Sequence, residues 1–386
     1  MNIAFIDVTS TVSYGGIQTA IWELARALHD QGHKVTVYGG KGSASVNLGE
    51  RRIDVRTFPF TPRDRFPNFG TRFKKFAERW SFARQAKQKV VAAEHDWIII
   101  TKPFDFFWTR LLPKSSKTRI AFMSGGTDFM PLDRYLAKGI GAWLACSHFN
   151  AWQISSRYKK YPKTMFNGVD IERFNPEQKD VELRTTLGVK DGEVLFAFAG
   201  RITGWKGLDV AIRALAEPIL RPIPVKLLLI GGGNALEELK RLASDLDLTD
   251  RVIFHPPVTH EQLPRYYASA DAGIFPSIGD EAFGITIAEA MASGIPAVAS
   301  HNGGIPEVIG NEGSTGILFE IGSVQECANA IAALIADPNK RIQLGRLARQ
   351  RIVDNFTWGM AAQRMTDTLL KANDFVSNRN NAHGLW

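Results

Sequence analysis

Short apolar runs alternate with helical patterns along the whole chain, and this alternation limits the possible folds more than any other feature. In the first half, the runs that predict buried strands are residues 3–8, 34–38, 97–101, 119–123 and 143–146. In the second half, they are residues 194–199, 226–230, 252–254, 272–275 and 297–300. Strands separated by helices favour parallel sheets joined by right-handed crossovers. The expected fold class is therefore α/β.

A chain of 386 residues is long for a single hydrophobic core, so we expect two domains. We place the N-terminal domain at residues 1–168 and the C-terminal domain at residues 169–355. A helix at about residues 356–372 is expected to pack back on the first domain. Open α/β sheets bind ligands beyond the carboxyl ends of their strands, and clefts between domains are favoured sites.

Two carboxylates lie eight residues apart in the segment 276–291. Glu281 is in a glycine-containing loop, and Glu289 is inside a helix that is predicted to begin near Phe283 or Gly284. The first turn of such a helix offers backbone N–H groups to an anion. A loop carboxylate beside that anion is suited to sugar hydroxyls, and the helical one to a ribose. This order of groups is typical of a nucleotide-sugar site.

Two further loops follow predicted strands and carry groups that suit phosphate. Gly15 and Gly16 allow close approach of a ligand to the backbone. In the loop 200–207, Arg201 offers a planar fork to a diphosphate and Lys206 a compact second charge. The chain contains neither the G-x-G-x-x-G fingerprint nor a Walker motif, which argues against a dinucleotide-dependent oxidoreductase and a P-loop enzyme.

Taken together, six motifs resemble those of the retaining glycosyltransferases of family 4, which have the GT-B fold, and the resemblance extends from about residue 1 to residue 370. The motifs are Gly15-Gly16, Asn167-Gly168-Val169-Asp170, Gly200-Arg201 with Lys206-Gly207, Pro276-Ser277, Glu281 with Glu289-Ala290-Met291, and Gly303-Gly304-Ile305-Pro306-Glu307. The two glutamates combined with the Arg/Lys pair are the most specific element. The resemblance implies two Rossmann-like parallel-sheet domains that face an interdomain cleft.

The resemblance also implies roles for the glutamate segment. Glu289 would accept hydrogen bonds from both ribose hydroxyls of the donor. Glu281, together with backbone groups of Phe283 and Gly284, would hold the donor sugar. The alternative for Glu289 is a helix carboxylate in a local ion pair.

The resemblance further implies that Arg201 and Lys206 neutralise the charge of the leaving diphosphate. In other transferases a metal ion neutralises this charge. The D-x-D sequence at residues 245–247 ends a helical segment and is expected to be solvated, so we predict no metal site. No cofactor is expected, since the nucleoside diphosphate sugar is a substrate. The glycines expected to line the cleft around the phosphates are Gly15, Gly16, Gly303 and Gly304.

The chain departs from the family after the predicted strand 119–123. Relatives often have a His-Gly-x-Asp-like motif there, whereas this chain has Ser124-Gly125-Gly126-Thr127-Asp128. The leaving phosphate can itself accept the proton of the acceptor hydroxyl, so the loss is compatible with activity. We expect Ser124, Thr127 or Asp128 to replace the sugar contact, and we include Asp128 among the catalytic residues.

Positive charge is concentrated between residues 63 and 89, where nine basic residues face two acidic ones, a balance of +7 out of +8 for the chain. Phe69, Phe73, Phe76 and Trp80 follow helical spacing within this segment. One interpretation is a helix lying on an anionic membrane. The other is that the aromatic face packs into the N-terminal core and the basic residues are its solvated face. No nucleic-acid-binding module is present, and no nucleic-acid partner is expected.

We therefore expect a retaining transferase that moves a sugar from a nucleoside diphosphate sugar to an acceptor hydroxyl, and we expect this sugar to be a hexose. The acceptor would be a glycan or a lipid-linked precursor in the synthesis of surface polysaccharide, lipopolysaccharide or glycolipid. Two alternatives are a nucleotide-sugar epimerase with the same fold and a non-catalytic nucleotide-sugar sensor or scaffold, suggested by the missing histidine. The first residues enter a strand without a signal-peptide pattern, which predicts a cytoplasmic protein, or one peripheral to the inner face of the membrane.

Overall fold

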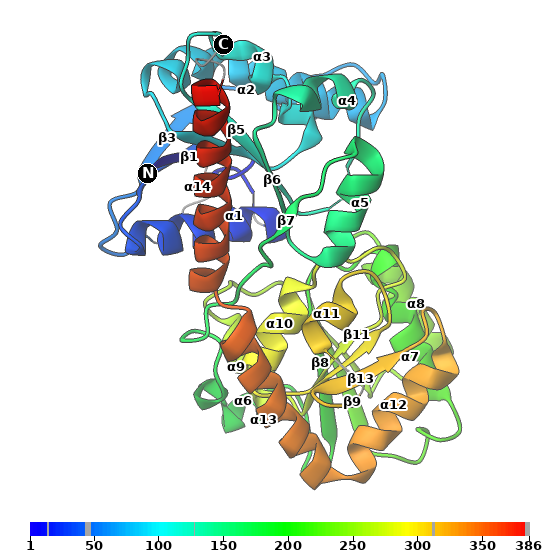
Figure 1. The fold of residues 1–386 in the computed structure, drawn as a ribbon. Helices are drawn as coiled ribbons and strands as arrows, with labels where there is room; N and C mark the ends of the chain where they lie inside the picture. The colour runs from blue at the N-terminus through cyan, green and yellow to red at the C-terminus, as the bar shows by residue number, and fades with distance from the viewer. Residues whose placement is uncertain (14, 43–47, 127, 311–312, 383–386) are drawn as a thin grey trace. The chain divides into compact units, whose positions relative to one another are not determined.

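The computed structural model describes residues 1–13, 15–42, 48–126, 128–310 and 313–382, with side chains in the last helix described as far as Asn373. The chain divides into two compact units (Figure 1). Unit 1 comprises Met1–Asn167 and Trp358–Trp386, and unit 2 comprises Gly168–Thr357. Among the described residues, no helix combines the length and the apolar character needed to span a membrane.

Unit 1 is built on a seven-stranded parallel sheet with the order β3-β2-β1-β4-β5-β6-β7. The central strands are apolar on both faces because helices cover both sides of the sheet, as parallel sheets require. The strands are β1 (Asn2–Ile6), β2 (Lys34–Gly40), β3 (Asp54–Phe58), β4 (Trp97–Ile100), β5 (Arg119–Ser124), β6 (Ala142–Ala145) and β7 (Lys163–Thr164).

The last helix of the chain returns to unit 1, where it crosses and packs against the first helix of the chain (Figure 1). Arg119 in β5 donates a hydrogen bond to Asn373 of this last helix at 2.7 Å, which ties it to the sheet. The α-helices of unit 1 are α1 (Gly16–Asp30), α2 (Thr71–Ala92), α3 (Trp108–Leu111), α4 (Asp133–Leu136), α5 (His148–Tyr158) and α14 (Trp358–Ala382).

Unit 2 repeats the same topology with a six-stranded parallel sheet of order β10-β9-β8-β11-β12-β13. Its strands are β8 (Val194–Ala199), β9 (Val225–Ile230), β10 (Val252–His255), β11 (Ala272–Phe275), β12 (Ala297–Ser300) and β13 (Gly316–Phe319). Its helices are α6 (Val181–Thr186), α7 (Leu208–Ala216), α8 (Leu236–Asp245), α9 (Leu263–Ser269), α10 (Ile285–Ala292), α11 (Ile305–Ile309), α12 (Val324–Ala336) and α13 (Pro338–Asn355).

The chain enters unit 2 and leaves it at the same place. Val169 forms a parallel β-bridge with Thr357. The N–H of Val169 donates to the carbonyl oxygen of Phe356 at 2.8 Å. The two ends of unit 2 are therefore held together by backbone hydrogen bonding within the unit.

The predicted α/β fold class and its parallel sheets are confirmed. All ten predicted strands are present, with ends that differ by at most two residues from the prediction. The three strands that the sequence did not indicate are β3, β7 and β13, and each lies at the edge of its sheet. Edge strands are half exposed or very short, so they lack the continuous apolar run of a central strand.

An aromatic cluster fills the core of unit 1 beneath β5 and β6. The rings of Phe106 and Phe122 meet edge to face at a centroid distance of 4.9 Å, and Trp143 lies 5.6 Å from Phe122. Phe122 is 1% exposed. Such geometry is the favoured one for aromatic pairs and adds to the free energy gained by burial.

Replacing Phe122 with alanine should lower the free energy of unfolding of unit 1 by about 3–5 kcal/mol, because it removes a buried ring and leaves a cavity. Urea denaturation followed by tryptophan fluorescence measures this change. Phe69→Ala is the matched control, since its ring is 75% exposed, and it should change the free energy by less than about 0.5 kcal/mol. Equal losses for the two variants would contradict the assignment of this cluster as the core.

Candidate functional site

The order of strands reverses once in each sheet, between β1 and β4 in unit 1 and between β8 and β11 in unit 2. Loops that leave the carboxyl ends of such neighbouring strands diverge, and this switch point is where open α/β sheets bind ligands. In unit 2, the loop after β8 carries Lys206 and the loop after β11 carries Glu281. In unit 1, Asp7 follows β1 and Thr101 follows β4. Four polar side chains thus occupy the two switch points.

Lys206 and Glu281, predicted as separate site residues, form an ion pair in unit 2. The Nζ of Lys206 donates to Oε2 of Glu281 at 2.5 Å. Their side chains are 13% and 18% exposed, so the pair is shielded but within reach of a ligand. The ammonium also lies 4.2 Å from the ring centroid of Trp205, a cation–π contact. The structure therefore places the ammonium of Lys206 and the carboxylate of Glu281 side by side at the switch point of the unit 2 sheet.

Close backbone contact holds the loops of this pair together. A Cβ atom on Gly207 would lie 2.1 Å from the carbonyl oxygen of Pro276, and the φ angle of Gly207 is +63°. The carbonyl of Trp205 accepts hydrogen bonds from the N–H groups of Ile278 and Gly279 at 2.9 and 3.0 Å. Only glycine at position 207 permits this approach without displacing the loop that leads to Glu281.

Gly303 and Gly304 lie against the backbone of the Glu281 loop. The N–H of Gly304 donates to the carbonyl of Glu281 at 2.8 Å. A Cβ atom on Gly303 would be 2.3 Å from that same oxygen, and one on Gly304 would be 2.4 Å from the carbonyl of Ala282. The predicted role of both glycines was to line the phosphates. Their contacts in the structure add a second role, which is to let the loop after β12 support the loop that carries Glu281.

Two further predicted groups of this site, Phe283 and Gly284, lie at the start of α10. This helix begins at Ile285, directly after the predicted start. Gly284 precedes it with φ +93°, and Phe283 is buried with its ring 5.6 Å from that of Phe356.

Arg201 is exposed and has no ion pair or hydrogen bond with the residues that the structure describes. The structure does not join Arg201 to the Lys206–Glu281 pair.

Glu289, in the middle of α10, is buried and has a histidine partner that sequence analysis missed. Its Oε1 lies 2.8 Å from Nε2 of His260. Nδ1 of the same ring lies 2.8 Å from Nη1 of Arg173. A guanidinium can only donate, so Nδ1 accepts and the proton on Nε2 is donated to Glu289. A lone histidine after Pro256-Pro257 carries no spacing signal that would have indicated this contact.

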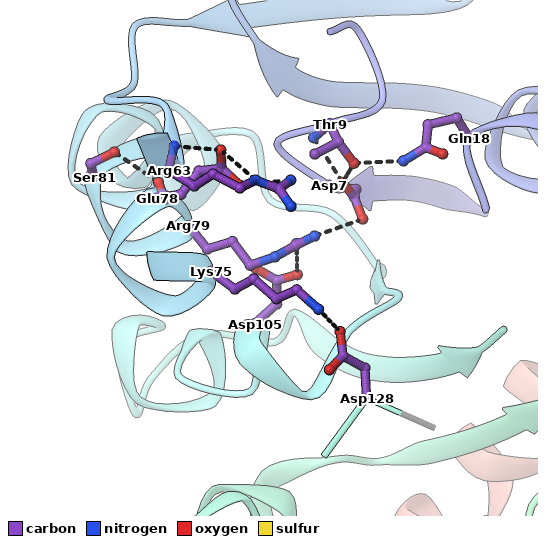
Figure 2. A network of polar contacts seen from close by, with 10 residues as sticks. All are labelled: Asp7, Thr9, Gln18, Arg63, Lys75, Glu78, Arg79, Ser81, Asp105 and Asp128. Carbon is purple, nitrogen blue, oxygen red and sulfur yellow. Dashed lines mark hydrogen bonds and ion pairs between the residues drawn. The ribbon is translucent and has the colours of Figure 1, made fainter. Parts of the chain in front are cut away.

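In unit 1, a network of buried charges surrounds the switch point (Figure 2). Arg79 of α2 donates to the carboxylate of Asp105 and, at 3.4 Å, to Oδ2 of Asp7. The hydroxyl of Thr101 donates to the same Oδ2 at 2.6 Å. One guanidinium therefore serves two carboxylates, and it ties α2 to the loops that follow β1 and β4.

The two carboxylates of this network differ in their affinity for protons. Burial raises the pKa of Asp7, but Arg79 and the hydrogen bonds from Thr101 and Thr9 outweigh it and bring the pKa below its ordinary value. Burial raises the pKa of Asp105 to about 7, despite the opposing influence of Arg79. The network thus contains one carboxylate that is ionised at all ordinary pH values and one that titrates near neutrality.

Asp128, predicted as a catalytic residue, is attached to the same helix. The Nζ of Lys75 in α2 donates to its Oδ2 at 2.7 Å (Figure 2). The charges of Asp128 and Lys75 both act on Lys102. The pKa of Lys102 is lowered, chiefly by burial and then by the charge of Arg79. The hydroxyl of Ser124 donates to the carbonyl of Gly126 at 3.2 Å. Thr127, the third predicted substitute for the missing histidine, lies outside the described residues.

Gly15 and Gly16 form the start of α1, with Gly15 as its N-terminal cap and Gly16 as its first residue. Gln18, in the first turn, donates to Thr9 Oγ1 at 2.6 Å, and Thr9 in turn donates to Asp7 at 2.5 Å. The predicted glycine loop is therefore connected by two hydrogen bonds to the buried network (Figure 2). In the described parts of the chain, no group of three or more His, Cys, Asp or Glu side chains is arranged to hold a metal ion.

The aromatic stripe of the basic segment is divided between two environments. Phe69, just before α2, and Phe73 in its first turn are exposed, with ring centroids 5.4 Å apart. Phe76 and Trp80 pack against Phe107 at 5.8 and 5.2 Å. The expectation that the basic residues of the helix form a solvated face is wrong for Arg79, which is buried because two carboxylates compensate its charge.

Two family models match the chain in succession. The model described as Glycosyltransferase Family 4 matches residues 14–173, and the model described as Glycosyl transferases group 1 matches residues 180–351. The first match falls in unit 1 except for its last residues, and the second falls within unit 2.

Several curated proteins are similar to this chain. It is 34% identical over 209 residues, 52% of this chain and 54% of the relative, to a GDP-mannose-dependent alpha-(1-6)-phosphatidylinositol monomannoside mannosyltransferase of Mycolicibacterium smegmatis. It is 34% identical to a D-inositol 3-phosphate glycosyltransferase of Rhodococcus erythropolis, over 57% of this chain and 52% of the relative. These alignments span about half the length of each relative. A Mycobacterium tuberculosis protein with the same name as the first is 26% identical over 92% of this chain and 94% of the relative.

Solved structures with the same architecture cover nearly the whole chain. The Anabaena protein HepE, in complex with UDP and glucose, matches with a TM-score of 0.77 and 24% identity over 96% of this chain and 100% of that one. Sucrose-phosphate synthase of Thermosynechococcus elongatus matches with a TM-score of 0.79 and 22% identity over 97% of this chain and 99% of that one. At these identities the likeness shows a shared fold.

The titration of Asp105 should make unit 1 less stable as the pH rises. The folded state holds its proton up to about pH 7, whereas the unfolded chain releases it near the ordinary value of 3.8. Between these values Asp105 binds more protons in the folded state, so its contribution to the free energy of unfolding falls with rising pH and levels off above about pH 7. Burial lowers the pKa of His95 to about 4, so His95 contributes in the opposite direction between about pH 4 and 6.5, and the contribution of Asp105 is read from a comparison with a variant that lacks it. The raised pKa of Arg79 does not change this trend, because the guanidinium is protonated throughout. Urea denaturation at several pH values measures the slope.

The free energy of unfolding of Asp105→Asn, taken relative to the wild type, should rise with pH between about 4 and 7, since the amide keeps an acceptor for Arg79 but does not titrate. Asp54→Asn is the matched control, because the Asp54 side chain is 42% exposed and pairs with Arg56 on an edge strand, and it should leave the wild-type pH dependence in place. A pH dependence in Asp105→Asn that equals that of the wild type would contradict this assignment of Asp105.

Proposed function

The chain belongs to glycosyltransferase family 4 and has the GT-B fold, and we propose that it transfers a sugar from a nucleoside diphosphate sugar to an acceptor hydroxyl with retention at the anomeric carbon. The observation that carries this proposal is the Lys206–Glu281 pair at the switch point of unit 2. It combines a cation for a departing diphosphate with a carboxylate for sugar hydroxyls, which is the pair of groups that such a donor requires.

In the proposed reaction, Lys206 stabilises the negative charge that develops on the leaving diphosphate, and Arg201 joins it when the donor is bound. Preorganised charges of this kind act without reorganisation during the reaction and supply a large part of the rate increase. Glu281 holds the ammonium of Lys206 in place at 2.5 Å before the donor arrives. We assign this electrostatic work to the two cationic side chains, so the proposed transfer needs no metal ion or other cofactor.

Glu289 is proposed to accept hydrogen bonds from the ribose hydroxyls of the donor. Its position in α10 supports this assignment, because the start of the same helix lies two residues after Phe283 and next to Gly284. Backbone groups there are proposed to contact the donor sugar and the phosphates, where the helix dipole favours negative charge. Gly303 and Gly304 keep the adjoining loop in place, and Gly15 and Gly16 are the proposed contribution of unit 1 to the phosphates.

Unit 1 is proposed to bind the acceptor near Asp128. The salt bridge to Lys75 orients this carboxylate, and the buried Arg79 network fixes the helix from which Lys75 projects. The relatives named above act on a phosphatidylinositol mannoside and on D-inositol 3-phosphate. We therefore propose a glycan or lipid-linked polyol as the acceptor, in the synthesis of a glycolipid or surface polysaccharide.

We also propose that unit 1 meets an anionic membrane surface through the segment 63–89, which would place the protein at the inner face of the membrane. Phe69 and Phe73 are exposed, and basic residues flank them. Apolar side chains that enter the interface and cations that attract anionic headgroups act together in such contacts. A lipid-linked acceptor would be concentrated at the same surface.

The function is tested by release of nucleoside diphosphate from UDP- and GDP-sugars in the presence of bacterial membrane lipids. Release from one donor should rise on addition of lipid and fall at least about 100-fold in Glu281→Ala, because the variant loses its sugar contact and frees Lys206. Glu237→Ala is the control, since Glu237 is 78% exposed on α8, and it should match the wild type.

Other outcomes would identify the alternatives. A nucleotide sugar that is isomerised without any acceptor would show an epimerase. Tight binding of a donor with no release under any condition would show a sensor or scaffold and would overturn the proposed transfer.

The membrane contact is tested by sedimentation with vesicles that contain anionic phospholipid at low salt. The variant with both Phe69→Ala and Phe73→Ala should show a bound fraction reduced several-fold, because burial of apolar area drives part of the binding. Tyr161→Ala is the control, since this side chain is 94% exposed in unit 1 but outside the basic segment. Equal binding of all three proteins would exclude the proposed surface, and added salt should weaken the wild-type interaction.

A further inference from the structure

We propose that Asp170, Arg173 and His260 are positioning residues that fix the carboxylate of Glu289 for the ribose of the donor. This inference rests on the proposed function. It gives a role to Asp170, the last residue of the motif Asn167-Gly168-Val169-Asp170, which has no part in the proposed donor site. The side chains of Asp170, Arg173, His260 and Glu289 all belong to unit 2.

The first link joins Asp170 to Arg173. The backbone N–H of Arg173 donates to Oδ1 of Asp170 at 3.0 Å, and Nη2 of its guanidinium lies 3.2 Å from Oδ2. Asp170 therefore holds both the backbone and the side chain of Arg173. A long side chain that is fixed at both ends loses little additional entropy when it makes a further contact.

The second link sets the tautomer of His260. Nη1 of Arg173 approaches Nδ1 of the imidazole at 2.8 Å, and because arginine offers only donors, Nδ1 must be the acceptor. The ring of Phe174 packs beside the imidazole with a centroid distance of 5.2 Å and limits its rotation. A neutral ring that accepts at Nδ1 carries its proton on Nε2.

The third link is the hydrogen bond from Nε2 of His260 to Oε1 of Glu289 at 2.8 Å. The Glu289 side chain is only 4% exposed, so a wrong rotamer would leave a buried polar group unsatisfied. A neutral imidazole orients the carboxylate without cancelling its charge, which a protonated ring would do. The carboxylate keeps further lone pairs for donors, as two ribose hydroxyls require.

A separate contact ties the same segment to the far end of α10. Arg349 of α13 donates to the carbonyls of Ile171 and Phe174 at 3.1 and 2.7 Å, and to the carbonyl of Ala292 at 2.6 Å. Ala292 is the last residue of the helix that carries Glu289. The segment that holds Arg173 is therefore bound to α10 both through the side chain of Glu289 and through the helix end.

Calorimetry with UDP and with GDP tests the inference, using the diphosphate that the wild type binds more tightly. His260→Ala should weaken binding at least about tenfold, because a hydrogen bond to a charged group is lost. His260→Gln should recover most of the affinity, since its side-chain amide can donate in place of Nε2. Arg173→Met should weaken binding about threefold to tenfold. Arg265→Ala, an exposed arginine of the same unit, is the control and should bind as the wild type does.

A spectroscopic measurement separates positioning from general stability. In protein labelled with ¹⁵N at histidine, the His260 ring should show the Nε2-protonated tautomer, and Arg173→Met should reduce its population. Wild-type affinity in both His260→Ala and Arg173→Met, with weakened binding in Glu289→Ala, would overturn the inference and leave the proposed function standing. Unchanged binding in Glu289→Ala would instead overturn the ribose role on which the inference rests.

Discussion

Parallel sheets can bind a ligand at few places, and this constraint organises the whole molecule. Both sheets reverse their strand order between two central strands, so the loops that leave those strands diverge and their polar groups become accessible. In unit 2 this geometry brings Lys206 and Glu281 together from loops 75 residues apart in sequence. In unit 1 it brings Asp7 beside Thr101, and Arg79 of α2 donates to the same carboxylate oxygen of Asp7 that accepts from Thr101. The chemistry of each unit follows from where its sheet reverses.

The two switch points use charge in different ways. In unit 2 the charges are largely shielded and paired one to one, which suits groups that change partners when the proposed donor binds. In unit 1 the central guanidinium of Arg79 is buried between Asp7 and Asp105, and its surroundings stabilise the charge strongly. Removing one member of such a group leaves an uncompensated buried charge, which is costly. The network of unit 1 is therefore structural support for nearby residues such as Lys75, which contacts Asp128.

The sequence predicted the central strands well because helices cover both faces of each sheet and make those strands apolar throughout. It missed β3 because the residues of this edge strand alternate between half-buried and exposed, so they form no continuous apolar run. Glu281 and Lys206 were predicted from motifs whose chemistry is local to each loop. Arg79 and His260 were not, because a basic helix and a lone histidine carry no local mark of the partner that buries them. Those partners are distant in sequence, and only the fold reveals them.

The bridge between Val169 and Thr357 has a consequence for how such enzymes can diversify. Both covalent connections to unit 2 leave it side by side, and backbone hydrogen bonds within the unit hold them there. The segment Gly168–Thr357 contains the Lys206–Glu281 pair, Glu289 and the residues that hold Glu289. Exchange of this one segment between relatives would transplant most of the proposed donor contacts, all except those of Gly15 and Gly16, through two adjacent joints. Under the proposed assignment, recombination would change the donor sugar while unit 1 kept its own acceptor.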